Sequence, residues 1–328
     1  MSNHLQIIRL LADGRFHSGQ ELADRLSVTR AAVWKQLQQI RERHGLEIHA
    51  VKGRGYRLAG PLQLLDRDAI LSALPASLCV RPAELEILER IDSTNRYLMQ
   101  KAVQGLANGH VCLAEQQTEG RGRRGRSWVS PFGGNLYLSL YWQYDLEMAA
   151  LSGLSLAAGV AVAECLQGLG VAEVALKWPN DLHWRERKLG GLLLEVSGEQ
   201  GGTSRVVLGL GLNLRMEREQ GASIDQPWVA LSRIPGAAAL DRNRVAGQVV
   251  GALIGALSQY QREGLSPFVP RWERFDHYLG KAVELTAGDR RVAGIHRGID
   301  PRGALLLETG RGISAHFGGE VSLRQAGP

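Results

Sequence analysis

The sequence predicts an α+β protein made of an N-terminal winged helix-turn-helix, a central mixed or antiparallel sheet with helices, and a C-terminal small SH3-like β-barrel. Three observations predict this class. The start of the chain has helical periodicity. The middle has closely spaced strands without room for crossover helices. The end has five brief strands separated by glycines. The expected domains are residues 1–64, 65–274 and 275–328.

The first domain has helix-turn-helix spacing. A helix over 4–12 is followed by Ser18-Gly-Gln-Glu21, a capping box in which the Ser18 hydroxyl accepts from the Glu21 amide and the Glu21 side chain accepts from the Ser18 amide. Thr29 is expected to cap a third helix. The residues expected to face inward are Leu5, Ile8, Leu11, Leu22, Leu26, Val33, Leu37 and Ile40.

A basic wing is expected after the third helix. Residues 48–58, IHAVKGRGYRL, indicate two short strands around a Gly-Arg-Gly turn. Residues 1–64 hold ten Lys and Arg against five Asp and Glu, so this end carries most of the net charge of +6. A third helix in the major groove would use Thr29, Arg30, Ala31, Trp34, Lys35 and Gln38, with Lys52, Arg54 and Arg57 of the wing near phosphates.

Two alternatives stay open for this domain. The same three helices and hairpin could form a protein-docking module without DNA contact. Trp34 could read a thymine methyl group, or it could pack under the wing.

The central domain is expected to alternate helices with directly consecutive strands. Strands are predicted at 85–91, 110–117, 135–142, 174–178, 181–184, 188–198 and 204–214, and helices near 95–104, 149–166 and 241–264. Five further strands are predicted at 281–288, 291–300, 304–310, 312–318 and 320–325.

Neither a membrane span nor secretion is expected. The most apolar run, 149–166, contains serines and Glu164 and is rich in Ala and Gly, which favours a buried helix. The N-terminus lacks a secretory pattern. Cys79, Cys112 and Cys165 lie far apart, without a disulfide or zinc pattern, so the cytoplasm is the expected location.

The stretch GRGRRGRSW, residues 120–128, matches G-x-G-x-x-G but lacks the context of a dinucleotide fingerprint. Such a fingerprint opens a helix, whereas Pro131 and paired glycines follow here. A P-loop ending is also missing. The stretch therefore indicates a phosphate-binding loop suited to a triphosphate, in which Arg121, Arg123, Arg124 and Arg126 present fork-like donors. Trp128 could stack on a base or pack in the core.

Two later stretches place polar groups beside strand breaks. KWPNDL, residues 177–182, sets Lys177, Asn180 and Asp181 around Pro179, and Lys188 precedes the Gly190-Gly191 pair at the head of an apolar strand. Such positions let backbone approach a ligand closely.

Taken together, GRGRRGRSW, KWPNDL, KLGG and GLGLNL resemble biotin protein ligases in order and separation. With the winged helix and the C-terminal β domain, the whole chain is similar to the bifunctional bacterial form, which also represses the biotin operon. The resemblance implies the central fold shared with lipoate ligases and class II aminoacyl-tRNA synthetases. It also implies formation of biotinyl-5′-AMP from biotin and ATP with Mg²⁺, then transfer of biotin to a lysine of a biotin carboxyl carrier protein.

The resemblance also implies roles for individual residues. Lys188, Arg123 and Asp181 would be catalytic. Biotin would be bound by Ser93, Thr94, Asn95, Gln117, Arg121, Gly122, Arg123 and Lys188. ATP or the adenylate would be bound by Arg124, Arg126, Trp128, Asn180, Gly209, Gly211 and Asn213. The missing side chains of Gly209 and Gly211 would leave room for the adenylate.

Some of these roles have competing interpretations. Asp92 or Ser93 alone would be read as a helix cap. Asp181 could assist the incoming lysine or the metal, or could hold Lys177 or Arg121 in place. No residue is assigned as a metal ligand.

The implied partners are the carrier protein and operator DNA of biotin synthesis genes, with a homodimer forming when the adenylate is bound. Three other functions remain possible. They are a non-catalytic biotin-sensing transcription factor, a lipoate ligase, and a ligase whose N-terminal domain has lost its DNA target.

Overall fold

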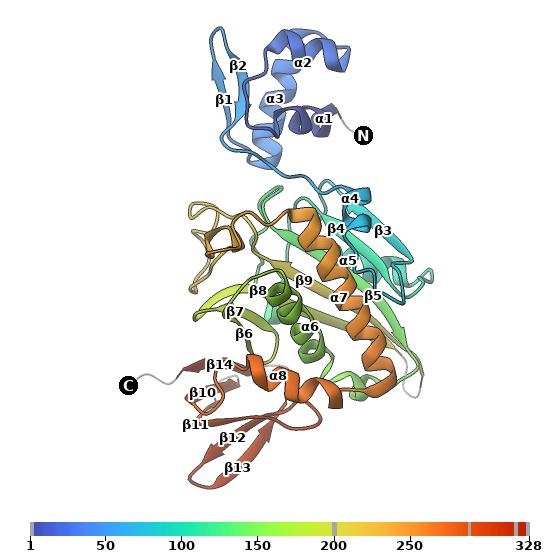
Figure 1. Cartoon of the computed structure of the whole chain (residues 1–328), viewed down its shortest axis with the longest axis vertical. Coiled ribbons are helices and arrows are strands. Elements are labelled where there is room, and N and C mark those ends of the chain that lie inside the picture. The colour runs from blue at the N-terminus through green and yellow to red at the C-terminus, as the bar shows by residue number, and fades with distance from the viewer. Residues whose placement is uncertain (1–2, 199–201, 288–289, 318–320, 326–328) are drawn as a thin grey trace.

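The computed structural model describes residues 3–198, 202–287, 290–317 and 321–325. Three bodies follow one another along the longest axis of the molecule, with the helix-rich N-terminal part at one end and a small β domain at the other (Figure 1). The prediction of an α+β fold with these three parts is confirmed. The domain boundaries at 64 and 274 stay predictions.

The N-terminal domain is the expected winged helix. Ser18 and Thr29 cap the second and third helices by accepting from the amides of Glu21 at 3.0 Å and Ala32 at 3.2 Å. Its elements are α1 (Asn3–Leu11), α2 (Gly19–Leu26), α3 (Arg30–His44), β1 (Ile48–Val51) and β2 (Gly55–Leu58). The buried core contains Ile7, Ile8, Leu11, Leu22, Val33, Leu37 and Ile40.

The Glu21 carboxylate has several partners. A hydrogen bond with the His17 side chain and, as the capping box predicts, a backbone hydrogen bond from Ser18 help to lower its pKa. The carboxylate pairs with Nδ1 of His17 at 3.0 Å and with Arg25 at 3.1 Å. His17 lies beside the wing because its backbone bonds to Tyr56. The Glu21 carboxylate therefore joins the start of α2 to the segment that pairs with the wing.

The central sheet has seven strands in the order β3-β4-β5-β9-β8-β7-β6. Only the pair β3 and β4 is parallel among the pairs described, because α5 connects them; the other neighbours are antiparallel. The strands are β3 (Glu84–Leu88), β4 (His110–Ala114), β5 (Leu136–Tyr144), β6 (Val174–Lys177), β7 (Asp181–Trp184), β8 (Arg187–Gly198) and β9 (Ser204–Leu212).

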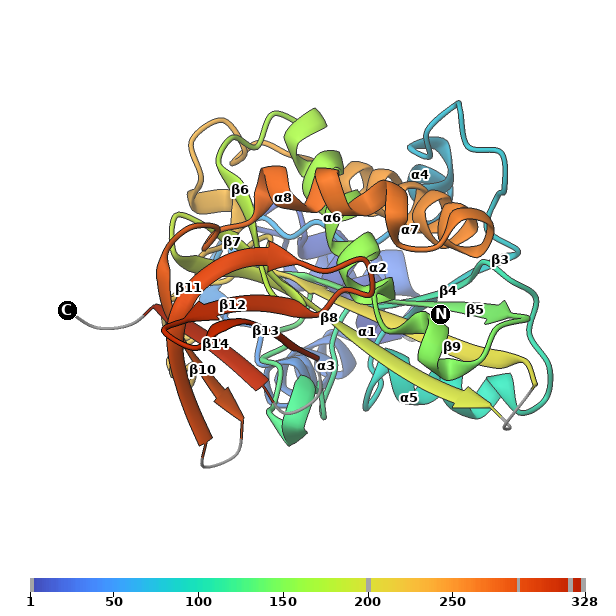
Figure 2. The ribbon, with the colours of Figure 1, turned by 90° about the horizontal axis from the view of Figure 1, so that it is seen from below.

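Helices cover both faces of this sheet (Figure 2). Leu98 and Ala102 of α5 pack on one face against Cys112, Tyr141 and Val207, while α6 and α7 pack on the other. The helices of this domain are α4 (Arg67–Ser72), α5 (Thr94–Ala102), α6 (Leu154–Gly168), α7 (Arg242–Glu263) and α8 (Val269–Phe275). Four 3₁₀ turns are η1 (Arg123–Gly125), η2 (Met148–Leu151), η3 (Leu231–Arg233) and η4 (Ser266–Phe268).

The segment Met148–Gly168 is long and apolar enough to span a bilayer, with a mean hydropathy of 1.7. Two thirds of its most apolar window (67%) is buried inside the protein, as expected for a core helix. Its burial agrees with the sequence-based prediction of a packed helix rather than a span.

The C-terminal domain is a five-stranded antiparallel sheet in the order β13-β12-β11-β10-β14. Its strands are β10 (Ala282–Ala287), β11 (Arg290–Ile299), β12 (Leu305–Thr309), β13 (Gly312–His316) and β14 (Val321–Gln325). All five strands were expected; the predicted ends at 288, 318 and 320 lie outside the described residues. The domain shares one hydrophobic core with the central sheet through Val283, Leu285, Ile299, Leu305 and Leu307.

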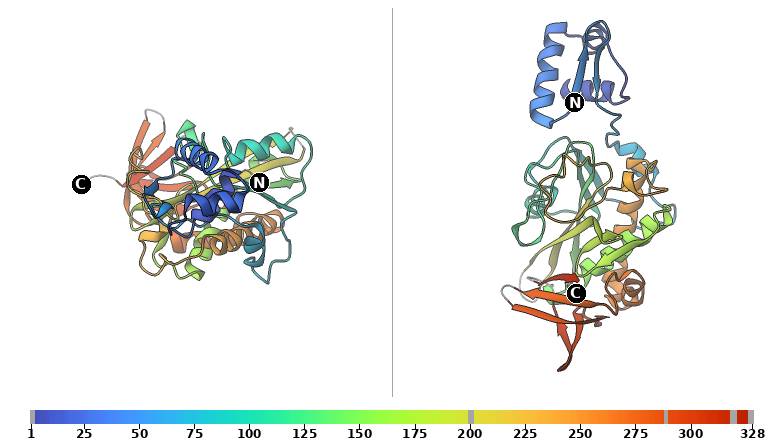
Figure 3. Two further views of the ribbon diagram at one scale, coloured as in Figure 1. Left: turned by 90° about the horizontal axis from the view of Figure 1, so that it is seen from above. Right: turned by 90° about the vertical axis from the view of Figure 1, so that its left-hand side faces the viewer.

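An aromatic residue of the central domain packs into the winged helix, beside an ion pair of 3.2 Å between His44 and Glu89. Figure 3 shows the N-terminal helices above the central sheet, joined by a short connection. Phe132, which follows the arginine-rich loop, is 3% exposed and belongs to the core of the winged helix. Its ring lies 4.5 Å from the ring of His44, the last residue of α3. Two domains that are distinct in sequence therefore share a side chain.

Candidate active site and DNA-binding surface

One cavity of about 610 Å³ in the central domain collects every ligand-binding and catalytic residue predicted from the sequence. The first turn of α5, the arginine-rich loop and the strands β7, β8 and β9 form its walls. The predicted residues that line it are Ser93, Thr94, Asn95, Gln117, Arg121, Gly122, Arg123, Arg124, Arg126, Trp128, Asn180, Asp181, Lys188, Gly209, Gly211 and Asn213.

The first turn of α5 provides one polar wall. Ser93 caps the helix by accepting from the Arg96 amide at 3.5 Å, so the cap interpretation holds together with a place in the cavity. Thr94 and Asn95 are buried because the start of the helix faces the sheet. Gln117, three residues after β4, accepts from the backbone amide of Thr94 at 2.9 Å.

The arginine-rich loop is folded into a compact turn in this structure. Arg121 and Ser127 form an isolated β-bridge, and the Gly122 amide donates to the Arg126 carbonyl at 2.7 Å. Arg124 has a φ of +59°, a left-handed conformation that is uncommon for a residue with a side chain. The turn presents its arginines in different directions.

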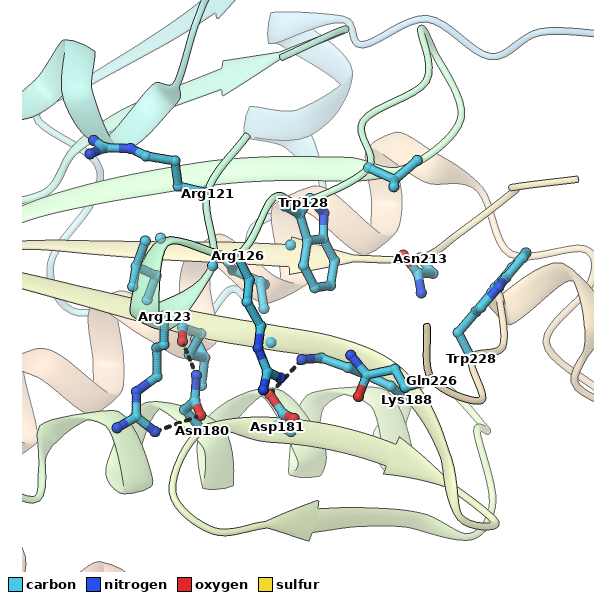
Figure 4. A pocket seen from close by; sticks show the side chains of 18 of the residues that line it. Arg121, Arg123, Arg126, Trp128, Asn180, Asp181, Lys188, Asn213, Gln226 and Trp228 are labelled. Carbon is cyan, nitrogen blue, oxygen red and sulfur yellow. Dashed lines mark hydrogen bonds and ion pairs between the residues drawn. The ribbon is translucent and has the colours of Figure 1, made fainter. Parts of the chain in front are cut away.

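The Arg123 side chain reaches Asn180, whereas the Arg121 side chain extends in a different direction (Figure 4). Arg123 donates to Oδ1 of Asn180 at 3.2 Å, while Arg121 forms an ion pair with Glu195 at 3.5 Å. Burial lowers the pKa of Arg123, and the neighbouring Arg124 adds to this effect while Asp181 opposes it. The guanidinium of Arg123 is thus a partly desolvated cation, which strengthens its attraction to an anionic ligand.

Lys188 lies at the centre of the cavity wall. Its ammonium forms an ion pair with Asp181 at 2.9 Å and lies 5.5 Å from the ring centroid of Trp128. The backbone of Lys188 is bonded to both Pro227 and Val229. Because both its backbone amide and its backbone carbonyl are hydrogen-bonded, the backbone of Lys188 is fixed in position.

The space above the two glycines of β9 is filled by protein side chains. A Cβ on Gly209 would lie 2.3 Å from Oδ1 of Asn95, and one on Gly211 would lie 2.4 Å from the Trp128 indole. Both glycines line the cavity, and the expectation that they leave room for the adenylate stays a prediction. Because Gly209 and Gly211 have no side chains, Asn95 and Trp128 can pack directly on β9, where these two residues line the cavity.

Sequence reasoning missed a second tryptophan. Trp128 and Trp228 lie on opposite sides of Asn213 (Figure 4), and Trp228 lines the cavity. Asn213 donates to the Val229 carbonyl at 3.2 Å, so it anchors the segment that carries Trp228. No sequence motif surrounds Trp228. The one feature that could have indicated a binding role was the position of a large aromatic residue in a long loop after a strand.

Several titratable residues of the cavity were not predicted as site residues. His183 is 4% exposed, and burial lowers its pKa to about 3, assisted by the positive charge of Lys177. The imidazole is therefore neutral at pH 7. Glu186, Asp225 and Tyr278 also line the cavity.

The winged helix presents most of the residues predicted to contact DNA. Thr29, Arg30, Lys35, Lys52 and Arg54 are exposed, whereas Gln38 is half-buried. Trp34 is 56% exposed, so the alternative that it packs under the wing is wrong. Arg57 is half-buried, and its guanidinium lies 4.9 Å from the ring of Phe16, where it supports the wing.

A winged helix joined to an α+β domain with a cationic, tryptophan-lined cavity defines a class of protein that combines a DNA-binding module with a ligand-using enzyme domain. Comparison with known families agrees with this class. Residues 87–213 match the Biotin/lipoate A/B protein ligase family, residues 3–57 match the HTH domain, and residues 278–324 match the Biotin protein ligase C terminal domain.

Characterised relatives cover nearly the whole chain. The bifunctional ligase/repressor BirA of Salmonella typhimurium is 45% identical over 98% of both chains. BirA of Escherichia coli is 43% identical over 98% of this chain and 97% of its own. The chain therefore belongs to the biotin protein ligase family, and to its bifunctional ligase/repressor form.

A solved structure supports the same fold. The biotin protein ligase from Aquifex aeolicus in complex with biotin and ATP is 29% identical, with a TM-score of 0.63. It covers 74% of this chain and 100% of its own.

Proposed function

We propose that this protein uses ATP to activate biotin as biotinyl-5′-AMP, transfers biotin to a lysine of the biotin carboxyl carrier protein, and represses biotin synthesis genes. The observation that carries the proposal is the convergence of Arg123, Lys188 and the Thr94–Gln117 wall on one cavity within a chain of this family.

In the first step, a carboxylate oxygen of biotin forms a bond to the α-phosphorus of ATP, and the bond to pyrophosphate breaks. Two anions must approach each other, so fixed cations lower the barrier. Arg123 and Lys188 are the two cationic groups that this cavity holds in place through Asn180 and Asp181. Arg124 and Arg126, which are exposed on the turn, would neutralise the outer phosphates.

In the second step, the carrier lysine attacks the biotinyl carbonyl carbon, AMP leaves, and the amine loses a proton. Asp181 would hold Lys188 against the phosphate until AMP departs, and is also the carboxylate best placed to attract the incoming ammonium. Trp128 and Trp228 would hold the adenine base by stacking. The compact turn would shield the mixed anhydride from water.

Mg²⁺ would accompany ATP. Among the described residues no group of three or more His, Cys, Asp or Glu side chains could hold a metal. Mg²⁺ is commonly bound by one or two carboxylates together with substrate phosphates. Asp181 would be the protein ligand, and the ion would neutralise phosphate charge.

For repression, we infer that two adenylate-bound molecules form a dimer and place two winged helices on a palindromic operator. The exposed face of α3 and the basic wing tip support DNA contact. We also propose a cytoplasmic location without a membrane partner, because Cys79, Cys112 and Cys165 are free thiols.

A biotinylation assay tests the ligase function. Purified protein is incubated with ATP, Mg²⁺, biotin and a carrier domain, and the carrier is probed with streptavidin. We expect labelled carrier, with lipoate as a non-competing acid. DNA binding without labelling would instead identify a biotin-sensing transcription factor.

A gel shift on the promoter of the chain's own biotin genes tests repression. We expect a shift only with biotin and ATP together. Absent or ligand-independent binding would show that the N-terminal domain does not act as the proposed repressor.

A further inference from the structure

Two residues that do not line the cavity connect to its polar wall through hydrogen bonds. Ser139 of β5 is completely buried and contacts both Thr94 and Asn95. Glu195 of β8 lies on the far side of Asn95, with 29% of its side chain exposed. Together with Gln117, these residues form a continuous chain of polar contacts.

The amide of Asn95 has one permitted orientation. Its nitrogen donates to Oε2 of Glu195 at 2.8 Å and to the Leu193 carbonyl at 3.3 Å. Both partners can only accept, so the NH₂ group must face them. Oδ1 of Asn95 therefore faces Ser139 Oγ, at 2.6 Å.

The amide of Gln117 is oriented in the same way at the other end of the chain. The backbone amide of Thr94 donates to its Oε1 at 2.9 Å, and a backbone N–H can only donate. The nitrogen of Gln117 then faces Ser130 Oγ, at 3.4 Å.

Two hydroxyl protons must therefore serve three oxygen–oxygen contacts. The contacts are Asn95 Oδ1 to Ser139 Oγ at 2.6 Å, Ser139 Oγ to Thr94 Oγ1 at 2.7 Å, and Thr94 Oγ1 to Gln117 Oε1 at 3.0 Å. We assign the two protons to the two shortest contacts, so that Ser139 donates to Asn95 and Thr94 donates to Ser139. The longest contact, between Thr94 and Gln117, is left without one.

Thr94 Oγ1 and Gln117 Oε1 then form a pair of acceptors in the wall of the cavity. Among the described residues, Thr94 Oγ1 then accepts from no donor, while Gln117 Oε1 accepts only from the Thr94 amide. A buried acceptor without a donor costs free energy, so the pair favours a ligand that supplies an N–H group. A cyclic urea carries such a group, whereas the dithiolane ring of lipoate does not.

We propose that the Glu195–Asn95–Ser139 relay fixes Thr94 and Gln117 as acceptors for one ureido N–H of biotin, and that it thereby selects biotin over acids without this donor. The inference rests on the proposed ligase function. Ser139, Asn95 and Glu195 act as positioning residues, because the ligand would meet Thr94 and Gln117.

The central test is S139A in the full-length protein. Without Ser139, the Thr94 hydroxyl turns to Gln117 Oε1 and the acceptor pair is lost. Pyrophosphate exchange should show a KM for biotin raised about tenfold, corresponding to one hydrogen bond, with kcat within about twofold. Discrimination between biotin and a derivative methylated on one ureido nitrogen should fall by a similar factor.

A double-mutant cycle separates positioning from a general packing effect. T94V removes the hydroxyl through which Ser139 acts, so S139A should add nothing in the T94V background. S204A is the matched control, since Ser204 is also a buried serine of this sheet but bonds to Leu146. Its kinetic constants should equal those of the wild type.

A second pair of variants covers the case in which S139A does not fold. E195Q keeps an oxygen acceptor for Asn95 and E195L does not, while both lose the charge that pairs with Arg121. The KM for biotin should be about threefold higher in E195L than in E195Q, because the Leu193 carbonyl still holds the amide in part.

Unchanged KM for biotin and unchanged discrimination in S139A would overturn the relay. A full S139A effect in the T94V background would also overturn it. If S139A does not fold, equal KM values in E195L and E195Q would have the same consequence. These results require a wild-type protein that biotinylates the carrier. Failure of the wild type would refute the proposed function instead.

Discussion

Lys188 combines three contacts that are separate in the sequence. Asp181 comes from the preceding strand, Trp128 from the arginine-rich loop, and the Pro227 carbonyl from the loop after β9. The ammonium is therefore held near the place where the carboxylate and phosphate of the substrates would meet. Its charge and its position both matter for the proposed first step.

We expect K188A to lower kcat for adenylate formation about 10²- to 10³-fold, as the loss of one transition-state donor does in other enzymes. K188R keeps the charge and should retain more activity. Pyrophosphate exchange measures the effect. K35A, which removes an exposed lysine of α3, is the control and should leave the rate unchanged.

Glu86 shows how a residue outside the cavity affects stability. Burial alone would raise its pKa, but hydrogen bonds from Lys101, His110 and Tyr97 outweigh it and lower the pKa to about 2. These bonds are 2.8, 2.5 and 2.9 Å long. They join the second turn and the end of α5 to the edge of the sheet.

Because the folded pKa lies below the unfolded one, the ionised Glu86 stabilises the fold above pH 4.5, and this stabilisation is lost as the pH falls towards 2. We expect E86Q to lower the free energy of unfolding by up to about 3 kcal/mol at pH 7. The difference from wild type should shrink between pH 4.5 and pH 3 in urea unfolding. A constant difference would contradict the assigned network, and E47Q, at an exposed site, is the control.

At the scale of elements, local patterns predicted most helices and strands because each depends on short-range chemistry. Thr29 caps α3 and Asp241 caps α7 through side-chain oxygens that accept from the amides three residues on. The helices α4 and α8 were missed. Each is one to two turns long, which leaves little periodicity to detect.

The third helix of the winged domain carries a test of DNA contact. Trp34 is 56% exposed, so W34A should change the midpoint of thermal unfolding little. We expect the same change to weaken operator binding about tenfold or more, because an exposed aromatic residue on this face would contact bases.

Fluorescence anisotropy with labelled operator DNA, in the presence of biotin and ATP, measures this effect. I313A is the matched control, since Ile313 is an exposed apolar residue of the C-terminal domain at 62% exposure. Equal operator affinity of W34A and I313A would exclude Trp34 from the interface.

At the scale of the whole molecule, one buried arginine connects three segments. Arg242, at the start of α7, donates to Glu115 at 2.5 Å, to the Gln63 carbonyl at 2.9 Å and to the Asn135 carbonyl at 2.8 Å. Gln63 belongs to the connection after the winged helix, and Glu115 and Asn135 flank the arginine-rich loop. The connection is therefore anchored rather than free.

We expect E115A to lower stability by about 3–5 kcal/mol, because it leaves the Arg242 charge buried without its partner. Urea unfolding measures the change. Replacing both residues by methionine should cost less than E115A alone. E173Q breaks an exposed pair with Arg185 and should cost under about 1 kcal/mol.

Local properties of the sequence are the N-terminal caps, the alternation of the strands and the density of arginines at 121–126. From the first two, the winged helix and the mixed sheet could be predicted, while phosphate binding by the arginine-rich loop stays a prediction. Family resemblance then named the site residues, all of which line one cavity. Trp228, Ser139 and Glu195 escaped prediction, since each contacts a site residue 40 or more positions away in the sequence.

Tertiary packing alone decided how those groups act on one another. Asn95 and Trp128 cover Gly209 and Gly211, Phe132 enters the core of another domain, and Arg242 joins the connection to both ends of the loop. Hydrogen bonds and close packing depend on atomic distances of a few ångströms, and only the folded chain sets these distances for residues remote in sequence.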